Sequence, residues 1–141
     1  MSAPDPSPLQ DVLAAVHAVV YGYGVAGARL RGRERARAVR RWNRHRADRD
    51  QLATLLTGAG HQPAQSAAAY RLPFPVGGPA DARELVILLE ERLAAVWADA
   101  VAALEGDLRD RAVEGLRDAA VAAAHWRRAS VTFPGLGERA G

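Results

Sequence analysis

The sequence predicts an all-α fold, and two observations carry this prediction. Alanine contributes 31 of the 141 residues, and leucine, arginine and glutamate are frequent while isoleucine and threonine are scarce, a composition that favours helices over strands. Four long segments also repeat apolar residues every three or four positions, which is the helical period. Hydrophobic residues make up 49% of a chain whose net charge is only +3, so a disordered chain is excluded and one packed domain is expected.

Start and stop signals delimit the four expected helices. Ser7-Pro8 precedes the first, and Gly58-Ala59-Gly60 ends the second. Pro79 opens the third, and Gly106-Asp107 separates it from the fourth. We expect helices over residues 9–30, 33–57, 79–105 and 108–129. We further expect residues 1–8 to be disordered, residues 9–130 to form the helical domain and residues 131–141 to be a flexible tail.

The lengths of the connections predict how the helices pair. The first and second helices are joined by very few residues, as are the third and fourth, so each pair should form an antiparallel hairpin. The middle connection, residues 58–79, is long and apolar, and we expect it to lie along the helices and bury Tyr70 and Phe74. Two antiparallel helix hairpins joined by a long crossover form the ferritin-like four-helix bundle. An up-down bundle with a loose central loop fits these apolar residues less well.

Three strings of residues resemble a known family. They are the run from His17 to Gly24 (HAVVYGYG), the pairs His45-Arg46 and Arg49-Asp50, and the run from Ala69 to Val76 (AYRLPFPV). Together they resemble an alanine-rich, actinobacterial, ferritin-like domain family of unknown function over about residues 9–129. The resemblance implies a ferritin-like bundle and brings no established reaction. The chain departs from the family at Val16, where the family often has glutamate.

A ferritin-like bundle raises the question of a di-iron site. Such a site needs inward carboxylates from the helices and Glu-x-x-His on two of them. Glu-x-x-His occurs nowhere in the chain, and Val16, which cannot ligate a metal, is central on the apolar face of the first helix. We therefore expect no metal and no cofactor. The alternative is a reduced carboxylate–histidine site that uses His17, His45 and one of Glu90 or Asp48. A core histidine is the simpler interpretation of His45.

Arg49 is an unusual residue on the second helix. Helical geometry places it on the same face as Trp42, His45 and Leu52. An unpaired guanidinium in a core would be costly, so Arg49 must find a carboxylate or extend to the edge of the bundle. We expect Arg49 to be at least half buried and to pair with Glu90 on the third helix, as a fixed cation that would also repel a metal.

Every basic residue of the chain is arginine, and many lie together. Residues 29–49 contain ten arginines and two acidic residues, a local charge of +8. Five of them share one stripe of the second helix: Arg33, Arg37, Arg40, Arg41 and Arg44. Such a stripe can bind the phosphates of a polyanion, but no aromatic residues are interleaved for base stacking and no known reading motif is present. We expect an ordinary solvated face and keep nucleic-acid binding as an alternative.

The sequence contains no recognisable catalytic motif, and a few of its residues indicate how the protein could bind or assemble. No cysteine, nucleophile-elbow or phosphate-loop motif is present, which favours a non-catalytic protein that acts by binding or assembly. Gly22, Gly24 and Gly27 suggest close approach of two helices or a pocket.

Alanine-rich helices have thin side chains and bury little area per residue, so a partner chain would add buried area and stability. We therefore expect a homodimer with Val86 and Trp97 at its interface. No membrane span and no secretory signal are expected, which indicates a cytoplasmic protein.

Overall fold

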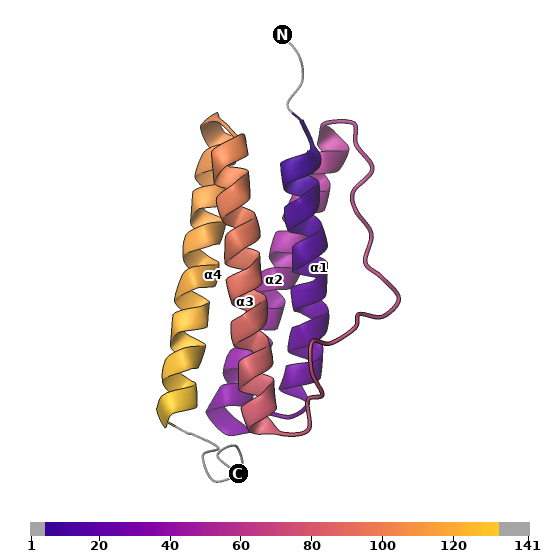
Figure 1. Ribbon diagram of the computed structural model, residues 1–141. Helices are drawn as coiled ribbons and strands as arrows, with labels where there is room; N and C mark the ends of the chain where they lie inside the picture. Colours follow the sequence, from indigo (N-terminus) through magenta and orange to yellow (C-terminus); the bar gives the residue numbers. More distant parts are fainter. Residues whose placement is uncertain (1–4, 133–141) are drawn as a thin grey trace.

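The computed structural model describes residues 5–132 of the chain. Within these residues it contains four helices and no strand: α1 (Ser7–Gly27), α2 (Gly32–Gly58), α3 (Pro79–Ala103) and α4 (Gly106–Thr132). Figure 1 shows the four helices side by side, with α1 and α4 running down the view and α2 and α3 running up. The prediction of an all-α protein with four helices is confirmed.

Local sequence explains where the helices begin and end. Proline lies in the first turn of α1 and of α3, where its missing N–H leaves no hydrogen bond unmade. Gly32 and Gly106 have φ values of +59° and +60°, a conformation that glycine adopts without strain, and each starts the helix that follows a short link. Residues 7 and 8 belong to α1, and residues 131 and 132 to α4. The remaining parts of the expected end segments, residues 1–4 and 133–141, lie outside the described residues.

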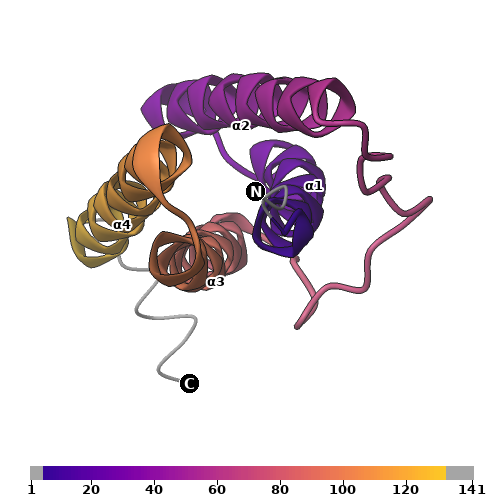
Figure 2. The same ribbon diagram turned by 90° about the horizontal axis from the view of Figure 1, so that it is seen from above.

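Helix α1 and helix α3 form the centre of the packing. α1 packs against both α2 and α3, and α3 packs against α4. α2 lies obliquely across the other helices in the view from above (Figure 2). Among the described helices, the backbones of α2 and α4 do not meet. Long charged side chains of α2 and α4 extend into the space between the two helices and contact one another there.

The aromatic residues Trp97, Trp126 and Tyr23 are the largest fully buried side chains of the core. Trp97 is only 1% exposed and Val86 is fully buried, so the prediction that these two residues form an interface is wrong. The helix α4 makes room for Trp97 at Gly115, where a Cβ atom would lie 2.2 Å from the indole ring. The Arg111 guanidinium lies 4.9 Å from the centre of the same ring. Trp97, which was expected at the surface, is therefore a core residue because Gly115 on α4 leaves space for its ring.

The three glycines of α1 have different surroundings. A Cβ atom at Gly22 would lie 2.1 Å from Cδ1 of Leu89, so this glycine permits the close approach of α1 and α3, as expected. A Cβ atom at Gly24 or Gly27 would meet no atom within 4 Å. These two glycines are not needed for helix packing, and they border an open groove that is considered below.

The segment between α2 and α3 runs beside α1 for much of the length of the bundle (Figure 1). Its partly buried side chains alternate with exposed ones in the stretch that ends at Val76, and Leu72 and Phe74 pack against the core. The Tyr70 ring lies 5.4 Å from the ring of Tyr21 on α1. Tyr70 and Phe74 are thus half-buried instead of buried, because an extended chain on the surface of a helix covers only one side of each ring.

Helix α1 is long and apolar enough to cross a membrane by length and composition alone. The same criteria are met by the core helix of a soluble protein and by a signal sequence. In this fold the face of α1 that contains Val12, Val16 and Val19 is buried against the other helices. The expectation that the chain has no membrane span stays a prediction.

Candidate functional site

A fully buried carboxylate, Glu90 of α3, forms the middle of a polar cluster inside the bundle. The Tyr23 hydroxyl of α1 donates a hydrogen bond of 2.7 Å to Oε2 of Glu90. Arg41 of α2 donates to the same oxygen from Nε at 3.0 Å and from Nη2 at 2.8 Å. Nε2 of His45, also on α2, lies 3.1 Å from Oε1 and 3.0 Å from Oε2. A charge buried this deeply needs such partners, because its loss of hydration is otherwise uncompensated.

Helix α4 completes the cluster from the opposite side. Asp118 accepts hydrogen bonds from Nη1 of Arg41 at 3.1 Å and from Nη2 at 2.9 Å, the bidentate geometry that a guanidinium matches best. Nε1 of Trp126 donates a 2.9 Å hydrogen bond to the Tyr23 hydroxyl. All four helices therefore contribute to one network, which we call the buried polar centre: Tyr23, Arg41, His45, Glu90, Asp118 and Trp126.

One nitrogen atom lies at the point where the charges of this centre converge. Nη2 of Arg41 is 2.8 Å from Glu90 Oε2, 2.9 Å from Asp118 Oδ2 and 3.1 Å from His45 Nε2. Two carboxylates and an imidazole are also the side chains that bind divalent metals. Within the described residues, no group of three or more such side chains is arranged to hold a metal ion. The guanidinium occupies the position toward which these three side chains point.

The network controls the protonation of its members. Burial by itself would raise the pKa of Glu90, but the hydrogen bond and charge of His45 and the charge of Arg41 outweigh it and lower that pKa. The pKa of Asp118 is lowered in the same way, since the hydrogen bonds from Arg41 outweigh burial. Burial and the Glu90 charge raise the pKa of Tyr23 well above its ordinary value. Both carboxylates are therefore ionised and the phenol is neutral at neutral pH.

These shifts predict a loss of stability in acid. Because the pKa values of Glu90 and Asp118 are lower in the folded state, their contribution is fully present above their ordinary values, 4.5 and 3.8, and disappears as the pH falls through the folded values. We expect urea unfolding midpoints to fall as the pH decreases from about 5 toward 2. The variant Glu90→Gln should show a weaker dependence on pH across this range. An identical dependence in the variant and the wild type would contradict the assignment.

The structure brings together only part of the expected metal-ligand set. His45 and Glu90 meet in the buried polar centre. His17 instead hydrogen-bonds from Nε2 to the backbone oxygen of Ala64 at 2.9 Å. Asp48 pairs with Arg111 of α4 at 3.0 Å, and its other neighbour is an arginine of its own helix. The reduced site of His17, His45 and one of Asp48 or Glu90 is therefore wrong, because His17 does not join His45.

The pair expected between Arg49 and Glu90 is also wrong, and Arg41 takes that role. The Arg49 side chain is 29% exposed and pairs with its neighbour Asp50 at 3.0 Å. The buried face of α2 runs through Ala38, His45, Asp48, Leu52 and Leu56. Arg41 lies one turn before His45 and Arg49 one turn after it, so both are near that face. Of the two, Arg41 is on the side that reaches Glu90 of α3 and Asp118 of α4. The sequence correctly indicated a core cation paired with Glu90, but placed it two turns too late.

The expected arginine stripe of α2 is divided between the surface and the interior. Arg33 and Arg40 are exposed, and Arg44 is half-exposed beside Asp48 at 3.4 Å. Arg37 lies 5.5 Å from the ring centre of Trp126, and Arg41 belongs to the buried polar centre. The interpretation of this stripe as one solvated face is wrong for these last two residues, because α2 and α4 are far enough apart for long side chains to fill the space between them.

Sequence reasoning missed three members of the buried polar centre, namely Tyr23, Asp118 and Trp126. Tyr23 lies on the apolar face of α1, and a buried phenol needs a hydrogen-bond partner. Trp126 lies on the apolar face of α4 and has the same requirement for its N–H group. A polar group on an apolar helix face was the sequence feature that could have identified these two residues. For Asp118 no comparable signal exists, since a carboxylate at the border of a helix face is more often solvated.

Comparison with known proteins agrees with this architecture. Residues 8–138 match the family model described as Domain of unknown function (DUF4439). The chain belongs to the DUF4439 family. A solved structure similar to this DUF4439 domain is that of a conserved hypothetical protein, rv2844, from Mycobacterium tuberculosis. It is 33% identical, with a TM-score of 0.84 over 87% of this chain and 94% of that chain. No curated protein matches the chain. These findings support the expected actinobacterial family of unknown function.

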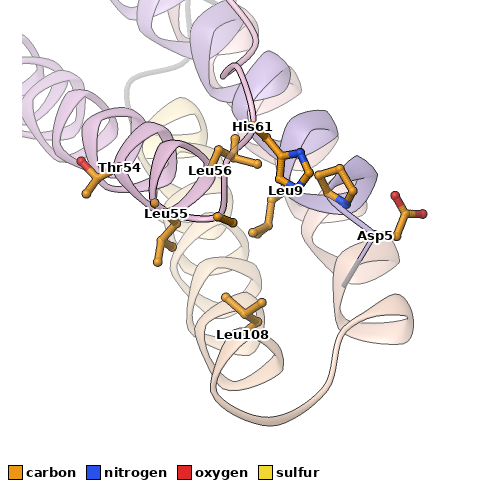
Figure 3. Close-up of a pocket in the computed structure, with 10 residues that line it drawn as sticks. Asp5, Leu9, Thr54, Leu55, Leu56, His61 and Leu108 are labelled. Carbon is orange, nitrogen blue, oxygen red and sulfur yellow. The ribbon is translucent and has the colours of Figure 1, made fainter. Parts of the chain in front are cut away.

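The DUF4439 domain also contains a cavity of about 420 Å³ at the end of the bundle where α1 begins and α2 ends. Figure 3 shows leucine side chains from three helices around it, with Leu9 from α1, Leu55 and Leu56 from α2 and Leu108 from α4. His61 and Asp5 also line it. The residues that line this cavity are mainly apolar. It lies between the ends of α2 and α4, whose backbones do not meet within the described residues. The oblique crossing of α2 therefore accounts both for this cavity and for the space that long side chains fill elsewhere between these two helices.

Proposed function

We propose that the protein is a ferritin-like bundle whose metal chemistry has been replaced by an internal arginine, and that it acts by binding or assembly without catalysis. Two short links, α1 to α2 and α3 to α4, and one long segment between α2 and α3 support the ferritin-like arrangement. The helix directions in Figure 1 are those of two antiparallel pairs joined in this way. Assembly is proposed as a homodimer, through a surface that excludes the buried residues Val86 and Trp97.

The position of Nη2 of Arg41 is the single observation that carries this proposal. The atom lies within 3.1 Å of Glu90, Asp118 and His45, one side chain from each of three helices. In ferritin-like proteins, inward side chains of this kind from facing helices converge on metal ions. Here the guanidinium places a fixed positive charge between the two carboxylates and donates hydrogen bonds to Oε2 of Glu90 and to both oxygens of Asp118.

The residues present do not fit a di-iron centre. A divalent cation placed among Glu90, Asp118 and His45 would lie within a few ångströms of the Arg41 guanidinium, where repulsion between like charges is strong in a buried setting. The ligand set is also short of carboxylates, because Val16 is fully buried on α1 and Ala122 is buried on α4. We therefore assign no metal-dependent step to this protein.

Metal analysis of the wild type and of one variant tests the proposal. The wild type purified after iron-supplemented expression should contain no stoichiometric iron. Removal of the guanidinium in Arg41→Ala frees the three ligands, so Zn²⁺ alone should bind the variant and raise its free energy of unfolding. The gain should be about 2.7 kcal/mol at a zinc concentration 100 times Kd. The wild type and the control Arg44→Ala, which removes a half-exposed arginine of the same helix, should show no such gain.

Two results would contradict the proposal. Two equivalents of iron per wild-type chain, lost in the variant Glu90→Gln, would show that the metal chemistry is retained. A folded Arg41→Ala variant that gains no stability from Zn²⁺ would show that Arg41 fills space without replacing a metal.

A further inference from the structure

A second groove lies between α1 and α2, away from the cavity in Figure 3. Its volume is about 230 Å³, and its lining includes Tyr23, Gly24 and Gly27 of α1 with Arg35, Val39 and Trp42 of α2. The groove is apolar along its walls and has a single charged residue, Arg35, among those that line it. It is smaller than the roughly 300–1,000 Å³ typical of sites for drug-sized ligands. Its size therefore suits a body of one or two aromatic rings.

Two glycines in the last turn of α1, Gly24 and Gly27, border this groove. Glycine is a weaker helix former than alanine, although the cost is smaller near a helix end than in the interior. At Gly22 the close contact with Leu89 explains the glycine, but a Cβ atom at Gly24 or Gly27 would meet nothing within 4 Å. Helix packing therefore does not require either residue, and a longer side chain at either position would enter the groove.

Arg35, which lines the groove, carries a charge that is not neutralised. Arg35 is exposed, as are Arg33 and Arg40, and the structure gives none of the three a carboxylate partner within residues 5–132. Glu34 lies in the same stretch of α2, but it accepts a 2.8 Å ion pair from Arg83 of α3. The free guanidinium of Arg35 at the edge of an apolar groove is suited to bind a phosphate through paired hydrogen bonds.

One aromatic residue besides Tyr23, Trp42, lines the groove. The Trp42 indole is half-buried, and the Arg46 guanidinium lies 4.4 Å from its ring centre. Val39 beside it is 45% exposed, which is unusual for a large apolar side chain of this protein. Exposed apolar and aromatic groups next to a free cation are typical of sites for small amphipathic ligands.

We infer that the groove between α1 and α2 binds a small aromatic phosphate, with its ring against Trp42 and its phosphate on Arg35. The phosphate is favoured over a single carboxylate because its second negative charge gains from other exposed arginines of α2, Arg33 and Arg40. This inference rests on the binding role proposed above and names a ligand class for it. Tyr23 of the buried polar centre also lines the groove, but the two residues assigned to the ligand, Trp42 and Arg35, lie outside that centre. The metal experiment and the ligand experiment can therefore fail independently.

A matched set of probes tests the inference with the full chain. 2-Naphthyl phosphate, 2-naphthol and inorganic phosphate present the two parts of the ligand together and separately. Isothermal titration calorimetry measures affinity, and the indole N–H signals of the three tryptophans in proton–nitrogen NMR spectra report the place of binding. The variant Trp42→Phe identifies the Trp42 signal. We expect 2-naphthyl phosphate to bind at least about tenfold more tightly than either single-part probe and to move the Trp42 signal selectively.

Variants of the chain separate the groove from the surrounding charge. Arg35→Gln and Gly24→Leu should each weaken binding of 2-naphthyl phosphate by about tenfold or more, through loss of the cation and by filling of the groove. The control Arg33→Gln removes another exposed arginine of α2 that does not line the groove and should change affinity by less than about twofold. Gly24→Leu should also raise the urea midpoint, because leucine is the better helix former, so weaker binding cannot be attributed to unfolding.

Three outcomes would overturn the inference. If 2-naphthol moves the Trp42 signal as strongly as its phosphate does, the site does not recognise an anion. If Gly24→Leu folds and binds as the wild type does, the groove is not the site. If Arg33→Gln and Arg35→Gln weaken binding equally while Gly24→Leu has no effect, α2 attracts phosphates only through its general charge, as a nucleic-acid surface would.

Discussion

The variant Arg41→Met is expected to lower the free energy of unfolding by about 3–5 kcal/mol, because it leaves a buried charge without its partner. Glu90 is fully buried and receives two hydrogen bonds from Arg41. After the substitution, Glu90 must stay ionised without the guanidinium or take up a proton, and either change costs stability. Urea unfolding of the variant and the wild type measures this difference.

A double-mutant cycle shows whether the loss comes from the pair. Arg41→Met combined with Glu90→Leu should cost less than the sum of the two single variants, with a coupling of about 0.5–3 kcal/mol. Recovery is expected to be partial, since Tyr23 and His45 would also lose their acceptor. The control Arg49→Met removes the cation that pairs with exposed Asp50, and should change stability by less than about 0.5 kcal/mol. Simple additivity of Arg41→Met and Glu90→Leu would show that the two residues do not act together.

The second large effect is expected from Trp97→Ala, which should cost about 3–5 kcal/mol of unfolding free energy. The indole is 1% exposed and lies against Gly115, where not even a Cβ atom would fit. Truncation to alanine leaves a cavity next to two rigid helix backbones, α3 and α4, which can close around it only in part. Urea unfolding of purified variants checks the magnitude.

Trp42 provides the matched control for Trp97. It is the same residue type but is half-buried on α2, so Trp42→Ala should cost clearly less than Trp97→Ala. Light scattering on both variants distinguishes a core role from an interface role. If Trp97→Ala changed the oligomeric mass while leaving the stability of each chain unaltered, Trp97 would belong to an interface between chains and the described packing would be wrong.

The amino-acid sequence by itself determined the helical class and the limits of the helices. Alanine-rich composition, the three- and four-residue apolar period and the turn glycines act locally, so they predict structure without knowledge of the fold. For this reason the expected ends at Pro79 and Gly58 agree with α3 and α2 within one or two residues. The absence of Glu-x-x-His was equally plain in the sequence. The sequence also indicated that an arginine of the second helix would pair with Glu90.

Only the tertiary structure decided which arginine that is and which residues surround it. Arg41 and Arg49 both lie close to the apolar stripe of α2, one turn before and one turn after His45, and helical period alone cannot separate two such positions. The choice depends on where Glu90 of α3 and Asp118 of α4 lie relative to α2, which is set by the packing of the helices. Likewise, Trp97 is buried because Gly115 of another helix admits its ring. Each of these outcomes depends on residues distant in sequence, because a contact between helices is a property of two surfaces, and the pattern within one segment describes only one of them.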